Sequence, residues 1–174
     1  DPAYNLSGNV LLDHLHGALQ KWGIDASAIR LELSEGSLGA DLDWSRHVLP
    51  RLLNQHILLG VDNFGAGLAS LTVLADLQPD FIKIDRRLVA SLATLPRAQH
   101  LARAGRLFAG ELGSLAIAEG IETDAELETL RELGFEHGQG RLIAAPMSGD
   151  ETTSWLQLAA QHHEPAAERE GWQR

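Results

Sequence analysis

Six polar side chains stand at the ends of short apolar runs that recur along the chain. They are Asn5, Glu32, Asp62, Lys83, Glu119 and Gln139. The intervals between them are 27, 30, 21, 36 and 20 residues, and each interval suits one strand followed by one helix. A parallel α/β barrel carries its chemistry at the carboxyl ends of successive strands. The spacing therefore predicts both a fold and the edge of the sheet at which an active site lies.

The residue types in this series indicate metal chemistry. Asn5, Glu32, Asp62 and Glu119 are oxygen donors, which Mg²⁺ and Mn²⁺ prefer as ligands. Lys83 lies in the otherwise apolar run FIKI, where a lysine is costly to bury without a carboxylate, phosphate or water partner. Such a set is typical of metal-assisted phosphodiester hydrolysis, in which the metal activates water and the lysine orients the water or the phosphate.

A plainer interpretation exists for every one of these acids. A single carboxylate at a strand end is more often a helix cap or a solvated loop residue. Glu35, Asp85 and Glu122, which also follow the apolar runs, could be caps or anchors. The functional interpretation therefore depends on the whole series and not on any one member.

Composition narrows the class of protein. The 174 residues carry a formal net charge of -10, which argues against a broad DNA or RNA surface because phosphate backbones require clustered Lys and Arg. The chain has no cysteine, which excludes disulfides and zinc–thiolate sites. No apolar run approaches the ~18 residues of a membrane span, and no signal peptide is visible. We expect a cytoplasmic domain, which could equally be a piece of a larger, membrane-anchored protein.

The elements that would position the polar series alternate between strands and helices. Strands are expected at residues 4–7, 28–35, 57–64, 80–85, 114–121 and 141–147. Helices are expected at residues 10–23, 41–56, 70–77, 86–95, 97–113, 124–133 and 152–161. This alternation calls for a parallel sheet. It predicts about six β/α units of an incomplete TIM-like barrel, because a full eight-fold barrel needs about 250 residues.

Local signals support these elements. In the run AIRLELSE, Leu31 and Leu33 face one side and Glu32 faces the other, so that Glu32 would line the inside of a barrel. Thr123 and Glu126 form a candidate capping box for the helix that follows, and Gly134 would end that helix. We expect one domain over residues 1–161, followed by a polar tail at 162–174.

The sequence resembles the EAL-domain family of bacterial phosphodiesterases for cyclic di-GMP. The segments that carry the resemblance are YNLS, LELSE, DNFGAGLASL, FIKIDRRLV, AEGIE and GQGRL. They follow the order of six motifs of that family and extend from Asn5 to about Met147. The resemblance implies a modified (β/α)8 barrel that binds Mg²⁺ or Mn²⁺ and cuts cyclic di-GMP to the linear dinucleotide pGpG.

The resemblance also implies roles for individual residues. Asn5, Glu32, Asp62 and Asn63 would be metal ligands, and Glu119 would serve the metal or act as a base. Lys83 would position the attacking water, and Gln139 would hold water by hydrogen bonding. Glu35 would anchor the glycine-rich loop after Asn63, Glu122 would support the site, and Asp85 matches the Lys-Ile-Asp signature without an assigned role.

Two departures from the family pattern bear on activity. The segment with the Glu-Ala-Leu signature, which supplies a metal-ligating glutamate, would precede residue 1. The family's active members carry Asp-Asp where this chain has Asp62-Asn63, and a neutral amide is a weaker ligand for a second metal. The alternative function is therefore a degenerate domain that acts as a cyclic di-GMP receptor or a protein-interaction module. Because an incomplete barrel exposes sheet edges, we also expect a homodimer or a partner signalling domain.

Overall fold

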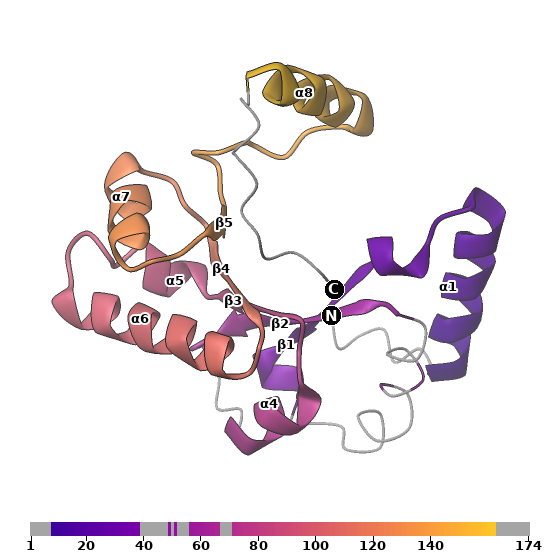
Figure 1. Cartoon of the computed structure of the whole chain (residues 1–174), viewed down its shortest axis with the longest axis horizontal. Coiled ribbons are helices and arrows are strands. Elements are labelled where there is room, and N and C mark those ends of the chain that lie inside the picture. The colour runs from indigo at the N-terminus through magenta and orange to yellow at the C-terminus, as the bar shows by residue number, and fades with distance from the viewer. Residues whose placement is uncertain (1–7, 39–48, 50, 52–55, 67–70, 163–174) are drawn as a thin grey trace. The chain divides into compact units, whose positions relative to one another are not determined.

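Five parallel strands form one sheet in which sequence order and spatial order agree. The structure is a computed structural model that describes residues 8–38, 49, 51, 56–66 and 71–162. The strands lie side by side in the order β1-β2-β3-β4-β5 (Figure 1). Their bounds are β1 Arg30–Ser34, β2 Leu58–Phe64, β3 Phe81–Ile84, β4 Leu115–Glu119 and β5 His137–Gln139. Since all four pairings are parallel, the five carboxyl ends meet at one edge of the sheet.

Helices precede, separate and follow these strands along the described chain. Their bounds are α1 Gly8–Trp22, α4 Leu71–Leu77, α5 Arg86–Val89, α6 Pro96–Glu111, α7 Asp124–Glu132 and α8 Gly149–His162, with short 3-10 turns η1 Ala26–Ala28 and η2 Glu35–Ser37. The Thr123 hydroxyl accepts from the Glu126 N–H at the start of α7, and the Glu126 carboxylate accepts from the Thr123 N–H, which completes the expected capping box. Gly134 follows the end of α7 with a φ of 83°, a conformation that glycine adopts readily.

The core lies between the apolar faces of the strands and the helices. Ile82 and Ile84 of β3 are fully buried, and Leu31 and Leu33 of β1 pack against a cluster that contains Leu59. This arrangement confirms the expected parity of β1. Helix α6 turns a row of small residues inward, namely Ala98, Ala102, Gly105 and Ala109. Their spacing of three and four residues keeps them on one helix face, so that the backbone of α6 approaches the sheet closely.

The prediction of a strand at residues 141–147 is wrong. Residues 141–147 contain turns and irregular backbone, and the fifth strand is the shorter segment His137–Gln139. The Leu142 N–H donates to the Ile121 carbonyl over 3.1 Å, and the Ile143 N–H donates back to the Gly140 carbonyl over 3.0 Å. These bonds close a turn and do not form the repeated strand-to-strand hydrogen bonds of a sheet.

The helix predicted over residues 86–95 is shorter than expected. It ends at Val89, and a series of turns follows. The Ser91 hydroxyl donates to the Arg87 carbonyl over 2.8 Å, a local bond that competes with helical geometry. Leu95 is extended, as the residue before a proline prefers to be.

Some predicted elements lie outside the described residues. These are the strand at 4–7, most of the helix at 41–56 and the polar tail. The chain divides into two compact units, Asp1–Ile143 and Ala144–Arg174. The second contains α8, at whose start Ser148 and Glu151 exchange hydrogen bonds. Among the described helices, none combines the length and the apolar character needed to cross a bilayer.

Candidate active site

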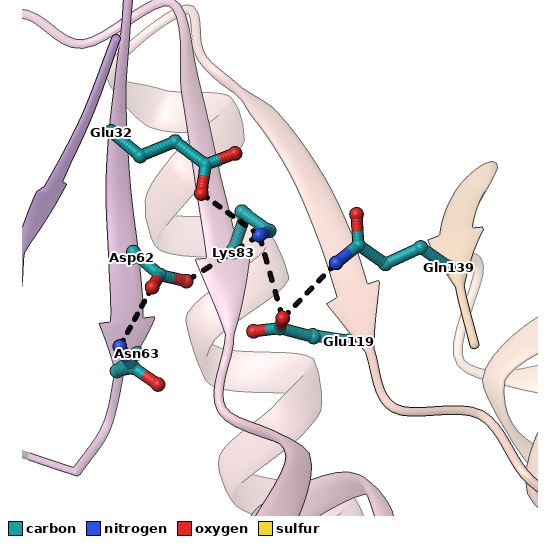
Figure 2. Close-up of polar contacts among 6 residues, drawn as sticks. All are labelled: Glu32, Asp62, Asn63, Lys83, Glu119 and Gln139. Carbon is teal, nitrogen blue, oxygen red and sulfur yellow. Dashed lines mark hydrogen bonds and ion pairs between the residues drawn. The ribbon is translucent and has the colours of Figure 1, made fainter. Parts of the chain in front are cut away.

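Three carboxylates, each from a different strand, converge on the ammonium group of Lys83, which lies on a fourth strand. Lys83 Nζ on β3 lies 3.0 Å from Glu32 Oε2 on β1, 3.6 Å from Asp62 Oδ1 on β2 and 3.4 Å from Glu119 Oε1 on β4 (Figure 2). Gln139 on β5 joins them, because its Nε2 donates to Glu119 Oε1 over 3.0 Å. We call these five residues the strand-end cluster.

The fold explains why these side chains meet. Glu119 and Gln139 are register partners on adjacent parallel strands, as are Ser34, two residues after Glu32, and Asp62. Side chains of one strand alternate between the two faces of the sheet. Glu32 therefore lies on the face opposite the core residues Leu31 and Leu33, where it reaches Lys83.

Lys83 keeps its charge within the sheet. Its neighbours Ile82 and Ile84 are fully buried, and Lys83 itself is 6% exposed. Burial alone would lower the pKa of the Lys83 ammonium. The hydrogen bond to Glu32 and the charges of Glu119, Glu32 and Asp62 outweigh burial and raise that pKa above its ordinary value. The cluster therefore holds a stable ammonium surrounded by carboxylates.

Asp62 is held on both sides. The Asn63 amide Nδ2 donates to Asp62 Oδ2 over 2.7 Å, as Figure 2 shows. Asp62 Oδ1 is shielded from solvent and makes no hydrogen bond within the described residues, although it faces the Lys83 ammonium. Asn63 has a φ of 59°, a left-handed conformation that Asn tolerates better than most residues. The neutral amide thus orients the aspartate without adding a charge.

Glycine at position 140 sets the place of Gln139. A Cβ added to Gly140 would overlap the backbone nitrogen and oxygen of Ile121. The Gly120 and Ile121 N–H groups both donate to the Gln139 carbonyl, over 2.9 and 3.1 Å. The segment GQG therefore lies directly against the end of β4, and the Gln139 side chain can reach Glu119.

Glu35 ties the ends of two strands together. Glu35 is 5% exposed, and its Oε2 accepts from the Gly65 N–H over 3.0 Å. Gly65 begins the glycine-rich loop after β2 and has a φ of 94°, which an L side chain rarely adopts. The contact is the one that a loop anchor would make.

Two other candidates lie outside the strand-end cluster. Asp85 caps α5, since its Oδ1 accepts from the Arg87 N–H over 2.8 Å, and it forms an ion pair with the Arg87 guanidinium at 3.0 Å. Among the described residues, Glu122 makes a backbone contact: its N–H donates to Glu126 Oε2 over 2.8 Å, and the residue is exposed. Asn5 lies outside the described residues.

A pocket of about 390 Å³ opens beside Asn63. It is lined by Ser34, Gly36, Asn63, Ala66, Asp85, Arg86 and Arg87. Sequence reasoning assigned no role to the two arginines. Their position directly after the Lys-Ile-Asp segment was the available signal, because residues that follow a strand end lie at the same edge as the cluster.

The comparison with known protein families decides the assignment. The sequence model of the family described as "EAL domain" matches residues 3–146, which is well over half of the chain. This chain belongs to the EAL-domain family. Its parallel sheet is accordingly part of the TIM-like barrel of the EAL type.

Known relatives of this EAL domain include named enzymes. It is 34% identical over 154 residues to "Cyclic di-GMP phosphodiesterase PA2567" of Pseudomonas aeruginosa, which covers 88% of this chain. The chain spans only 26% of the length of that relative, which is therefore a much longer protein.

Solved structures resemble the EAL domain closely. The EAL domain of Mycobacterium smegmatis DcpA matches 95% of this chain and 72% of its own with a TM-score of 0.83 at 30% identity. A Klebsiella pneumoniae BlrP1 manganese/cy-diGMP complex matches 74% of this chain and 33% of its own with a TM-score of 0.70 at 30% identity.

The side chains of the EAL domain fit a hard divalent cation by their chemistry. Among the described residues, no group of three or more acidic or imidazole side chains is already arranged as a metal site. Glu32, Asp62 and Glu119 face the Lys83 ammonium. All three are nevertheless oxygen donors. The shielded Asp62 Oδ1, which lacks a hydrogen bond in the described structure, is an acceptor that a cation would satisfy.

Proposed function

We propose that this EAL domain hydrolyses cyclic di-GMP to pGpG with the help of Mg²⁺ or Mn²⁺. The observation that carries the proposal is the convergence of Glu32, Asp62 and Glu119 on Lys83 at the carboxyl edge of the sheet. The names of the relatives and the manganese/cy-diGMP complex of BlrP1 support the choice of substrate and of a divalent cation.

The proposed metal ligands are Glu32, Asp62 and Glu119, with the Asn63 side-chain oxygen and Asn5 as neutral donors. The bound cation would polarise the phosphate and lower the pKa of the attacking water. Hydrolysis adds the water oxygen to phosphorus and breaks one phosphorus–ribose oxygen bond, so that the ring opens to a linear dinucleotide.

Lys83 and Glu119 supply the remaining chemistry in this proposal. The Lys83 ammonium donates hydrogen bonds to the water or to a phosphate oxygen, where it offsets developing negative charge. Glu119 accepts the proton that the attacking water loses, and the ribose oxygen that leaves phosphorus takes up a proton to become the hydroxyl of the linear product. Gln139 keeps the Glu119 carboxylate in place through the 3.0 Å hydrogen bond between their side chains.

The arginine-lined pocket is the proposed place for the rest of the nucleotide. Arg86 is exposed at the edge of the pocket, and Arg87 is held there by its bond to Asp85. In an acidic domain, these guanidinium groups offer the charge that a phosphate requires. The proposal does not need a broad basic surface, because the ligand is small.

Chromatography of cyclic di-GMP incubated with the domain and Mn²⁺ tests the proposal. We expect pGpG to form, to disappear with EDTA and to fall by at least about a hundredfold in Glu32→Gln, since metal catalysis needs its ligands in place. Glu128→Gln is the matched control, because it removes an exposed carboxylate whose ion pair with Arg131 is long at 3.8 Å. Unchanged cyclic di-GMP in the presence of Mn²⁺ would refute hydrolysis.

A receptor is the second candidate function, and Asn63 is the observation that favours it. The Asn63 amide donates to Asp62, and a neutral ligand at this position weakens a second metal site. A receptor would bind cyclic di-GMP, measured by calorimetry, without releasing pGpG. A protein-interaction module would do neither.

The edge of the sheet at β1 is the proposed surface for a partner. Within the described residues, β1 pairs only with β2, and its other edge has no strand beside it there, which supports a homodimer or a partner domain at that edge. Light scattering distinguishes a dimer from a monomer. The cytoplasmic location expected from the sequence also stays a prediction.

A further inference from the structure

Lys83 already occupies the centre of the carboxylates that would hold a metal. Its Nζ contacts Glu32 Oε2, Asp62 Oδ1 and Glu119 Oε1 at 3.0, 3.6 and 3.4 Å. One ammonium cannot neutralise three carboxylates, so the cluster keeps an excess of negative charge. Like charges this close repel one another strongly when water is partly excluded. The ammonium therefore compensates part of a repulsion that would otherwise oppose folding.

The contacts are also required by Lys83 itself. The residue is 6% exposed between two fully buried isoleucines, and a buried ammonium is costly unless it is paired. Removing one partner of such a pair leaves the other charge uncompensated. Lys83 and the three carboxylates thus stabilise each other in the absence of any metal.

A divalent cation must share the same oxygens. The three carboxylates that contact Lys83 are the charged ligands of the proposed metal site. The Lys83–Asp62 contact is the longest of the three, and Asp62 Oδ1 makes no hydrogen bond within the described residues. Glu32 is the most accessible, with 39% of its side chain exposed. A cation entering at these two acids would meet the ammonium as a competing positive charge.

We infer that Lys83 is a built-in counter-cation, which holds the carboxylates together before metal binding and competes with the metal for them. The inference rests on the proposed function, since it concerns the same metal site. It assigns Lys83 a role in setting metal affinity and metal-free stability, in addition to its proposed contact with the water or the phosphate.

Charge removal at Lys83 is the direct test. In Lys83→Met, we expect calorimetry to show Mn²⁺ binding at least about tenfold tighter than in the wild type, because a close positive charge is gone. Melting in EDTA should occur at a lower temperature, and Mn²⁺ should raise that temperature more than in the wild type. Lys21→Met is the matched control: it removes the charge of the other lysine, which is exposed at the end of α1 and lies over the Trp22 ring, and its Mn²⁺ affinity should change less than about twofold because exposed charges are screened.

A second measurement uses the wild-type protein and needs no variant. The lysines in the sequence are Lys21 and Lys83 alone. Acetylation by an N-hydroxysuccinimide ester, quantified by mass spectrometry, reports how available each amine is. Mn²⁺ should increase the labelling of Lys83, as the carboxylates leave the ammonium for the metal, and leave Lys21 at the end of α1 unchanged.

The outcomes distinguish the counter-cation role of Lys83 from the proposed metal-dependent function. Wild-type binding of Mn²⁺ with no tighter binding in Lys83→Met, or with unchanged labelling of Lys83, overturns the counter-cation role and leaves the metal-dependent function standing. No binding of Mn²⁺ by either protein overturns both. A Lys83→Met chain that folds only with Mn²⁺ supports the inference.

Discussion

Gln139 and Glu119 are register partners on adjacent strands, and their side chains are hydrogen-bonded over 3.0 Å. Glu119 Oε1 accepts this bond and also faces the Lys83 ammonium. The amide therefore fixes the direction of the carboxylate that contacts Lys83. A residue that orients a catalytic or metal-binding group in this way acts through that group.

Gln139→Ala should lower the rate of hydrolysis without unfolding the domain. We expect kcat to fall about 10- to 100-fold, the usual effect of removing a hydrogen-bond partner of a metal ligand. The melting temperature should change little because Gln139 is exposed. Steady-state kinetics with Mn²⁺ checks this, and a wild-type kcat in the variant would show that Glu119 needs no such support.

Gly140→Ala should disturb the same contact from the backbone. The added Cβ would overlap the backbone of Ile121, so β5 must shift away from β4. We expect a loss of about 1–3 kcal/mol in the free energy of unfolding, measured in urea, together with a lower kcat.

The control for that substitution is Gly110→Ala in α6. A Cβ at Gly110 meets nothing within 4 Å, and alanine favours a helix interior over glycine by about 0.5–1 kcal/mol. Gly110→Ala should therefore stabilise the domain. A Gly140→Ala variant as stable and active as the wild type would mean that β5 does not depend on this close approach.

The candidate site was partly predictable from the sequence. Glu32, Asp62, Lys83, Glu119 and Gln139 follow apolar runs, and parallel strands bring such positions to one edge whatever the side chains between them. Residues 141–147 were misassigned because the run RLIAAP is apolar enough for a strand, while the true strand, His-Gly-Gln, is short and polar. Gly140 allows this segment to lie close to Ile121, and the Gln139 carbonyl accepts hydrogen bonds from Gly120 and Ile121 at the end of β4.

Side-chain partners were harder to predict than strand ends. The sequence left Asp85 open between a site residue and a cap, and the structure shows a cap with an ion pair to Arg87. Which partner a carboxylate takes depends on distances of a few ångströms, and spacing along the chain does not determine them. The hydrogen bond from the Asn63 amide to Asp62 is likewise not predicted by any sequence motif.

Asn63→Asp should lower the stability of the metal-free domain and raise its affinity for Mn²⁺. The Asn63 amide now donates to Asp62, whereas an aspartate would place a second negative charge beside it. In EDTA the variant should melt at a lower temperature, because adjacent carboxylates repel. Mn²⁺ should bind about tenfold tighter, equivalent to roughly 1.4 kcal/mol, and hydrolysis at saturating Mn²⁺ should increase. Calorimetry and product chromatography check both effects, and unchanged Mn²⁺ affinity would contradict the expectation.

Asp85→Ala should destabilise the domain in a pH-dependent way. Burial raises the pKa of Asp85, but the Arg87 hydrogen bonds and the charges of Arg87 and Arg86 lower it below its ordinary value of 3.8. The stabilisation is therefore complete above that ordinary value and is lost as the pH falls through the lower, folded-state value. Urea unfolding should show a deficit of about 1–2 kcal/mol at neutral pH, which narrows as the pH drops below 3.8. A deficit that stays constant into acid would show that the ionised carboxylate contributes nothing.

The most direct test of the central claim is the time course of pGpG release from cyclic di-GMP by the wild type and by Lys83→Ala, each saturated with Mn²⁺. The strand-end cluster as an active site predicts pGpG from the wild type and a rate at least about a thousandfold lower from the variant, because it lacks the group that orients the water and offsets charge. Equal rates in the two proteins, or cyclic di-GMP that is bound but never cleaved by the wild type, would contradict it.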